Sequence, residues 1–210
     1  VFIYKTIYDE DGNLYIFGCI YNQVGSIYSL VIKLNACGEL QWCRQFNFDE
    51  YMFNYFTDGI FSPNGDLLAI AYMPIGGGNF YDRIFLFCIS PDGEFLWKKS
   101  LASGANYPCF EERSGSRIQY FDDIYIISGY VYSPHPNYPG ILSIRPMFIG
   151  IDTLFNEKWV LQFGLEDNMK GKAHTSIPIN DSLFMGVGRY RYIGSSGETK
   201  DAWAMYYNDK

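Results

Sequence analysis

The chain has 210 residues, of which 48% are hydrophobic and 19% aromatic, and its formal net charge is -7 at pH 7. This composition predicts a folded protein with a sizeable core and argues against an intrinsically disordered chain. The acidic balance repels phosphate, and the 16 Lys and Arg residues form no cluster along the sequence, so no nucleic-acid partner is expected. The longest apolar runs are only as long as strands, so no membrane span is predicted.

The first 48 residues contain four candidate strands separated by turns. Residues 1–8 form the first strand, and the turn Asp11-Gly12 leads into an apolar strand that begins at Leu14. A third strand at 30–35 is followed by a glycine turn and by a strand that carries Trp42. Because glycine provides the positive φ that tight hairpin turns require, these segments are predicted to form antiparallel hairpins.

The same pattern returns in three further copies. We place the start of the second strand of each copy at equivalent residues, which are Leu14, Leu67, Ile124 and Leu183. The final strand of copies one to three is predicted to lie at the outside of its sheet. Its Trp is expected to be substantially buried against a neighbouring copy, and these residues are Trp42, Trp97 and Trp159.

Short strands repeated at this spacing predict a β-propeller. The predicted fold class is all-β, a single propeller segment of four consecutive four-stranded antiparallel blades. The blades cover approximately residues 1–48, 49–103, 104–165 and 166–210, and the last is incomplete. Because an open sheet edge invites pairing, we expect the segment to belong to a larger propeller of six to eight blades.

The stretch from Lys33 to Cys43 resembles the propeller repeats of secreted proteins from Bacteroidetes, many of which end in a type IX secretion sorting domain. The resemblance covers the whole chain at the level of the repeat and implies a secreted or cell-surface location. It implies no site residues, because the shared positions are structural. The stretch from Ser90 to Trp97 is similar to the box of sialidases but departs from it, since Gly93 directly follows Asp92, and a plain hairpin is expected.

Residues for catalysis or metal binding do not form a recognisable set. The two histidines, His135 and His174, lie a repeat apart, which argues against a His-based catalytic or metal site. Asp9, Asp11 and Asn13 have a spacing that could present oxygens to calcium, but no bidentate Glu follows, so a hairpin turn is expected. We therefore predict no catalytic residue, no metal site and no cofactor.

The cysteines leave the cellular compartment open. Five cysteines cannot all pair within one chain, and their spacing is not that of a zinc site. Cys37 and Cys43 flank the first glycine turn and could form a local disulfide, although free thiols are the favoured interpretation.

The best candidate for a functional surface lies in two aromatic and basic segments of copies three and four. The segment from Tyr132 to Arg145 is rich in proline and is predicted to be a long loop, and residues 189–192 occupy the corresponding place one repeat later. Equivalent loops of adjacent blades should form one surface for an acidic or carbohydrate partner. The residues of this predicted surface are Tyr132, Tyr138, Arg145, Arg189, Tyr190, Arg191 and Tyr192.

The repeated residues are those that build blades, and no convergent polar set for chemistry is visible. The sequence therefore favours a non-enzymatic binding or scaffold module of a secreted or cell-surface protein. Two alternatives stay open: a glycan-active propeller enzyme whose carboxylates come from different blades, and a secretion cargo segment with no activity of its own. The expected partners are a protein or carbohydrate ligand, or the remaining blades of the same protein.

Overall fold

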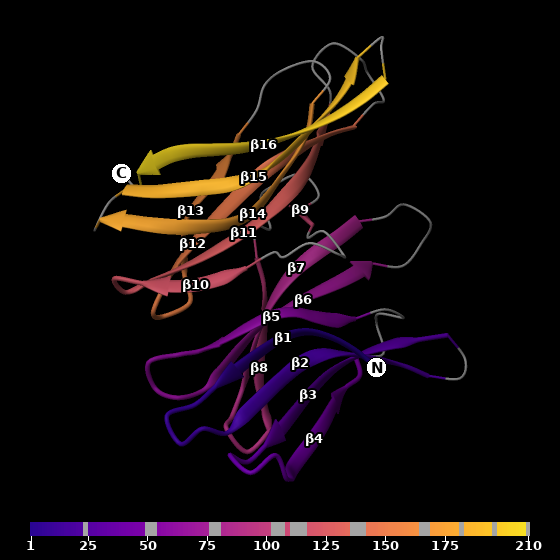
Figure 1. The fold of residues 1–210 in the computed structure, drawn as a ribbon, viewed down its shortest axis with the longest axis vertical. Coiled ribbons are helices and arrows are strands. Elements are labelled where there is room, and N and C mark those ends of the chain that lie inside the picture. Colours follow the sequence, from indigo (N-terminus) through magenta and orange to yellow (C-terminus); the bar gives the residue numbers. More distant parts are fainter. Residues whose placement is uncertain are drawn as a thin grey trace. The chain divides into compact units, whose positions relative to one another are not determined.

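The computed structural model describes residues 1–22, 25–48, 54–75, 81–101, 108–109, 117–134, 142–163, 169–180, 183–194 and 197–208. These residues form sixteen β-strands and no helix, which confirms the predicted all-β fold (Figure 1). No helix that could cross a membrane is therefore found in these ranges. The chain divides into two compact units, Val1–Leu101 and Ala102–Lys210, and each is described by itself.

The first unit contains two four-stranded antiparallel sheets whose strands follow chain order, drawn from indigo to magenta in Figure 1. Blade 1 consists of β1 (Phe2–Tyr8), β2 (Leu14–Tyr21), β3 (Ile27–Leu34) and β4 (Leu40–Phe46). Blade 2 consists of β5 (Tyr55–Phe61), β6 (Leu67–Ile75), β7 (Tyr81–Ile89) and β8 (Phe95–Ser100).

The second unit contains one eight-stranded sheet that holds blades 3 and 4. Blade 3 consists of β10 (Ile118–Phe121), β11 (Ile124–Pro134), β12 (Leu142–Asp152) and β13 (Glu157–Gln162), and β9 (Pro108–Cys109) also pairs with β11. The strands of blade 4 are β14 (Met169–Asn180), β15 (Leu183–Gly194) and β16 (Gly197–Asn208). A single parallel pair, Ile144 with Lys170, joins the two blades.

The second strands of the four copies begin at Leu14, Leu67, Ile124 and Leu183, as predicted, but the position equivalent to Leu14 lies one residue further along in blade 3. Leu14 pairs with Leu34 just before the turn that ends β3, and Tyr125 pairs with Ile151 just before the turn that ends β12. Tyr125, and not Ile124, is therefore the counterpart of Leu14.

Blade 4 shows the same shift. Phe184 packs against blade 3 as Leu67 packs against blade 1, so Phe184, and not Leu183, takes the equivalent place. In blade 3, the sequence alignment of the repeats is off by one residue because the turn between β10 and β11 has only two residues, Asp122 and Asp123. The turn between β1 and β2 in blade 1 has five. A slip of one residue exchanges the two faces of a strand, so it changes which side chains are assigned to the core.

The three Trp residues of the repeat occupy equivalent positions on β4, β8 and β13, as predicted. Each pairs with the residue that comes just before a register shift in the neighbouring strand. Each Trp is partly buried. Nε1 of Trp42 in blade 1 donates a hydrogen bond of 3.1 Å to the carbonyl oxygen of Pro91 in blade 2, so this ring binds the turn of the neighbouring blade.

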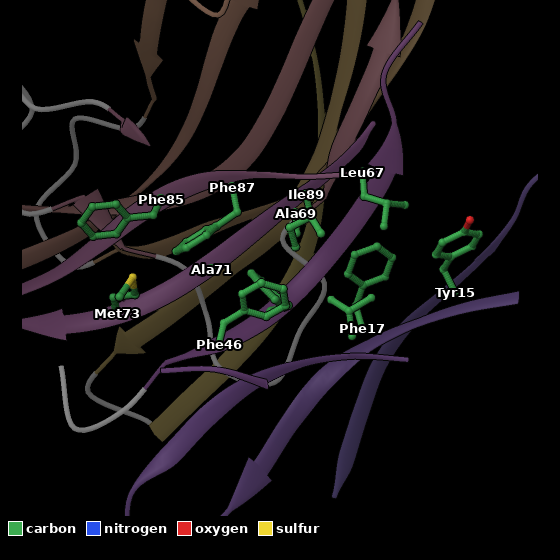
Figure 2. Packing of buried hydrophobic residues seen from close by; sticks show 12 residues of the cluster. Tyr15, Phe17, Phe46, Leu67, Ala69, Ala71, Met73, Phe85, Phe87 and Ile89 are labelled. Atoms are coloured by element: carbon green, nitrogen blue, oxygen red, sulfur yellow. The ribbon is translucent and has the colours of Figure 1, made fainter. Parts of the chain in front are cut away.

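The core of the first unit lies between blades 1 and 2. Figure 2 shows Phe17 of β2 directed toward Leu67 of β6, and both side chains are fully buried. The Phe17 ring contacts Phe56, with 6.3 Å between ring centroids. Gly59 provides the space for this ring, since a Cβ at that position would lie 2.6 Å from the Phe17 side chain. The two blades are thus fitted to each other by an aromatic side chain over a glycine.

The first hairpin turn is held by Asp9. Its Oδ1 accepts a hydrogen bond of 2.8 Å from the backbone N–H of Asn13, and its Oδ2 accepts one of 2.8 Å from Nδ2 of Asn13. Burial by itself would raise the pKa of Asp9, but hydrogen bonds from Asn13 and Tyr15 and the charge of Lys33 outweigh it and lower that pKa. The hairpin interpretation of this motif is confirmed.

Four cysteines are free thiols. Cys37 and Cys43 are exposed and do not form the local disulfide that the sequence left open, whereas Cys19 and Cys88 are buried. Burial, reinforced by the nearby Asp66 carboxylate, raises the pKa of the Cys88 thiol to about 12. Cys88 is therefore a packing residue that stays protonated at neutral pH.

Candidate functional site

The first strand of the blade carries a β-bulge at an equivalent position in three blades. The pairing register shifts at Tyr4 in β1, at Thr57 in β5 and at His174 in β14. A bulge inserts an extra residue and re-aims its neighbours, and bulges are frequent next to functional sites. These bulges mark the place in each unit where polar side chains are brought together.

In blade 1 the bulge directs two consecutive side chains toward blade 2. The ring centroid of Tyr4 lies 5.6 Å from that of Tyr55, and Nζ of Lys5 lies 3.1 Å from Oδ1 of Asp58. Successive side chains of a regular strand point to opposite faces of the sheet, so the extra residue is what allows both contacts. An amine, a carboxylate and an aromatic ring therefore meet between β1 and β5.

The ion pair is asymmetric in burial. The Asp58 side chain is fully buried, whereas 24% of the Lys5 side chain is exposed. A carboxylate removed from water requires a compensating charge, because an uncompensated buried ion costs several kcal/mol. The carboxylate in turn fixes the position of the Lys5 amine, and the three N–H donors of an ammonium group allow it to serve further acceptors.

Three tyrosines form a stack beside this ion pair. The ring of Tyr55 stacks on Tyr4 and on Tyr72, with centroid distances of 5.6 and 5.0 Å and an interplanar angle of 29° in both contacts. Tyr55 is only 2% exposed, and it packs with Cys19 and Ile27. Tyr4 and Tyr72 are half-buried, so the stack offers part of its aromatic surface to solvent. The residues Tyr4, Lys5, Tyr55, Asp58 and Tyr72 are called the tyrosine-stack site below.

A buried amide lies next to the stack in the chain. Oδ1 of Asn54 accepts a hydrogen bond of 2.7 Å from the backbone N–H of Ser29, and the Asn54 backbone N–H donates to the carbonyl oxygen of Ile27 at 2.9 Å. Within the described part of the chain, Nδ2 of Asn54 has no hydrogen-bond partner. Buried amide donors of this kind are normally satisfied, so an additional acceptor is expected there.

The bulge of the second unit is held by hydrogen bonds between blades 3 and 4. Oε1 of Gln119 in β10 accepts hydrogen bonds of 3.2 and 3.0 Å from the backbone N–H and the hydroxyl of Ser176 in β14. Oγ of Ser128 donates to the carbonyl oxygen of His174 at 2.9 Å. These bonds fix the bulge through the backbone of His174. His135 lies outside the described residues.

The segments of the predicted surface are strands where loops were expected. Tyr132 lies in β11, Arg145 lies in β12, and residues 189–192 lie in β15. β11 extends as far as Pro134, and β12 continues through Pro146, which pairs with Tyr130; residues 135–141 of the predicted loop lie outside the described residues. Tyr138 lies outside the described residues.

The backbone register places the predicted surface on both faces of the sheet. Positions 189 and 191 of β15 belong to one face, and positions 190 and 192 belong to the other. Tyr132 pairs with Ile144 and Arg145 pairs with Val131, so Tyr132 and Arg145 are also on opposite faces. The strands themselves are adjacent, since Lys170 of β14 pairs with both Ile144 and Arg191. As a binding surface, this set stays a prediction.

The sequence interpretation missed the tyrosine-stack site. One signal was present: Asp58 interrupts the otherwise mostly apolar strand Tyr55–Phe61, and a carboxylate is almost never fully buried unless it is paired. The partner Lys5 could not be found in the same way, because the bulge that directs it toward blade 2 leaves no mark in the residue pattern.

Comparison with known proteins supports the fold. The sequence matches no protein-family model and no curated protein. Among solved structures, a mutant levansucrase from Bacillus subtilis is similar, with 11% identity and a TM-score of 0.56 over 97% of this chain and 65% of that one. A mutant levansucrase from B. megaterium has 11% identity and a TM-score of 0.53 over 97% of this chain and 64% of that one.

The present chain spans 65% and 64% of the length of these two proteins. At 11% identity the likeness concerns the fold and not the chemistry. Together with the four antiparallel blades, it defines the chain as a β-propeller protein.

Proposed function

We propose that this propeller binds carbohydrate at the tyrosine-stack site. The observation that carries the proposal is the juxtaposition of partly exposed Tyr4 and Tyr72 with the Lys5 amine. Sugar rings present apolar C–H faces that pack on aromatic rings and hydroxyls that accept hydrogen bonds, so they are matched by this combination. Asp58 acts as a positioning residue, because it holds the amine beside the stack.

The similar solved structures are compatible with this proposal. Both are levansucrases, enzymes named after the carbohydrate levan. The present chain would share their general ligand class, while the sugar and the activity have to be established by experiment.

A glycan array followed by calorimetric titration of the best sugar tests the proposal. Tyr72→Ala should weaken binding at least about tenfold, the effect of losing an interaction of roughly 1.4 kcal/mol. Tyr8→Ala is the matched control, because Tyr8 lies in β1 and is 67% exposed but takes no part in the stack. Absence of sugar binding by the wild-type protein, or equal affinity of Tyr72→Ala and Tyr8→Ala, would contradict the proposal.

A second candidate function is glycan chemistry at Asp58. A fully buried carboxylate at a β-bulge is the observation that favours it. Glycosidases generally use two carboxylates, so a second acid would have to come from another blade. A panel of glycosidase and glycosyl-transfer substrates tests this alternative. Turnover that falls in Asp58→Asn by a larger factor than sugar affinity does would support an enzyme. No turnover by wild type would rule it out for these substrates.

We further propose a secreted or cell-surface location, with type IX secretion as the route. The support is the resemblance of the Lys33 to Cys43 repeat to secreted Bacteroidetes propellers. Fractionation of the source cells with an antibody against the chain tests this: recovery in the medium or outer surface is expected, and confinement to the cell interior would contradict it.

A further inference from the structure

Blades 2 and 4 each use one apolar face of their sheet to pack against the blade that precedes them. In blade 2 this face carries Leu67 and Phe87, which are fully buried in one cluster with Phe17 of blade 1. In blade 4 it carries Phe184, which is buried in one cluster with Phe148 of blade 3. The blades of this chain therefore have one face for the preceding blade and one for the following blade.

The face of blade 1 that is equivalent to the Leu67 face of blade 2 is apolar and partly exposed. Ile3 and Phe56 correspond, because each is the residue just before the bulge of its strand, yet Ile3 is 58% exposed and Phe56 is 0% exposed. Leu14, the counterpart of Leu67, is half-buried, whereas Leu67 is fully buried. Strand pairing places six apolar side chains, all half-buried or exposed, on this face. They are called the open face of blade 1, and they are Ile3, Leu14, Ile16, Ile32, Leu34 and Leu40.

Blade 4 has a partly exposed face of the other kind, the one that a following blade covers. Met185 comes directly after Phe184 in β15, so the two side chains point to opposite faces of the sheet. Met185 pairs with Ile177 of β14 and with Tyr206 of β16, and these two partners are 42% and 67% exposed. The open face of blade 4 consists of these three residues together with Val187 and Ala204, which pair in the adjacent row.

Both open faces resemble the packed faces inside each unit more than a sheet face that meets water. A solvated sheet face is normally polar, and a contiguous exposed apolar patch marks an interaction site. The rows of paired residues through Leu14, Ile16 and Met185 contain no charged position among the described residues. The chain itself holds two matching halves, since one open face is the kind that accepts a preceding blade and the other is the kind that accepts a following blade.

We propose that the open face of blade 4 of one copy of the chain packs on the open face of blade 1 of a second copy. The contact repeats the packing of blade 1 on blade 2, with the first copy in the place of the preceding blade. Because its two surfaces differ, the association is head-to-tail, and such contacts close into a ring where the rotation allows and otherwise extend into chains. The proposal does not rest on carbohydrate binding, since Tyr4 and Lys5 are directed toward blade 2 and not toward the open face of blade 1.

Sedimentation velocity of the whole chain over a range of concentrations tests the proposal, with self-association of wild type as the expected result. Ile3→Glu with Leu40→Glu changes the open face of blade 1, and Ile177→Glu with Tyr206→Glu changes that of blade 4. Each double variant should associate at least about tenfold more weakly than wild type, because the contact would bury carboxylates without partners.

A control variant and a mixing experiment make the test specific. The control is Leu96→Glu with Leu154→Glu, which makes the same change in net charge at exposed leucines outside both open faces and should associate as wild type does. Mixing the two double variants in equal amounts should restore a one-to-one complex, because each keeps the open face that the other has lost.

Three results would overturn the proposal. They are a wild type that stays monomeric up to about 1 mM, a mixture of the two variants that stays monomeric, and a blade 4 variant that associates as strongly as wild type. The substituted side chains are all exposed, so thermal melts should show folded variants. If a double variant unfolds, the single changes Leu40→Glu and Tyr206→Glu replace the pairs with the same expected direction.

Discussion

At the scale of single residues, packing in this protein depends on side chains fitted over glycines. Gly150 in β12 pairs with Trp159 in β13, and the indole ring covers the glycine. A Cβ at position 150 would overlap that ring, so Gly150→Ala forces Trp159 out of place.

We expect Gly150→Ala to lower the free energy of unfolding by about 1–3 kcal/mol, the usual cost of overpacking. Denaturant unfolding followed by tryptophan fluorescence measures it. Combining Gly150→Ala with Trp159→Leu should cost less than the sum of the two single changes, because the clash disappears with the ring. Strict additivity of the two changes would contradict the proposed contact.

Thiol exposure gives a second prediction at this scale. Cys37 and Cys43 are exposed, whereas Cys19 and Cys88 are buried and the pKa of Cys88 is raised to about 12. The thiolate is the reactive form, so iodoacetamide should modify Cys37 and Cys43 first in the folded protein. Peptide mass spectrometry gives the order of modification, and a denatured sample is the control in which Cys19 and Cys88 should react as readily as Cys37 and Cys43. Early modification of Cys88 would contradict its buried position.

At the scale of the strands, the bulges decide which residues meet between blades. The bulge at Tyr4 directs both Tyr4 and Lys5 toward β5, where Lys5 pairs with the fully buried Asp58. Removing the Lys5 amine while leaving the Asp58 carboxylate should therefore lower the free energy of unfolding more than replacing both groups does.

We expect Lys5→Met to destabilise the protein by about 3 kcal/mol, at the lower end for a buried pair because Lys5 is partly exposed. The double variant Lys5→Met with Asp58→Leu should recover part of that loss. Lys158→Met, an exposed lysine in β13, is the control and should change stability little. Chemical denaturation of the four proteins measures the differences, and an unaffected Lys5→Met would show that the pair contributes nothing.

At the scale of the whole molecule, the described strands form antiparallel sheets apart from the single parallel pair, and the carboxylates of Asp9 and Asp152 each hold a hairpin turn. The backbone N–H of Asn156 donates to Asp152, which is the largest effect in lowering the pKa of Asp152, and Asn13 and Tyr15 help to lower that of Asp9. A carboxyl whose pKa is lower in the folded state stabilises the fold above its unfolded pKa. That stabilisation is lost as the pH falls through the folded pKa.

The thermal melting temperature should therefore stay nearly level from neutral pH to about pH 5 and fall below about pH 4. Asp9→Asn with Asp152→Asn should melt lower than wild type at neutral pH and converge with it in acid. Calorimetric scans across pH check this, with Glu10→Gln as an exposed control. A constant difference between variant and wild type at all pH values would contradict the role given to these turns.

The sequence by itself determined the repeat, the all-β class, the hairpin turns and the equivalent Trp positions, because these depend on residues that are close in the chain. Turn glycines and strand alternation act locally and leave a readable pattern. The strand starts at Ile124 and Leu183 were also predictable, but the offset of one position in blade 3 was not, since a turn of two residues at Asp122 and Asp123 takes the place of one of five and exchanges the two faces of the strand.

Only the tertiary structure decided which residues act together. Lys5 and Asp58 are 53 positions apart and meet because a bulge re-aims one strand toward the next blade. Ile177 and Tyr206 look unrelated in the sequence and come to lie on one face because both pair with Met185. Pairing partners and bulges are set by contacts between distant segments, and the free energy of those contacts belongs to the assembled sheets and not to any local run of residues.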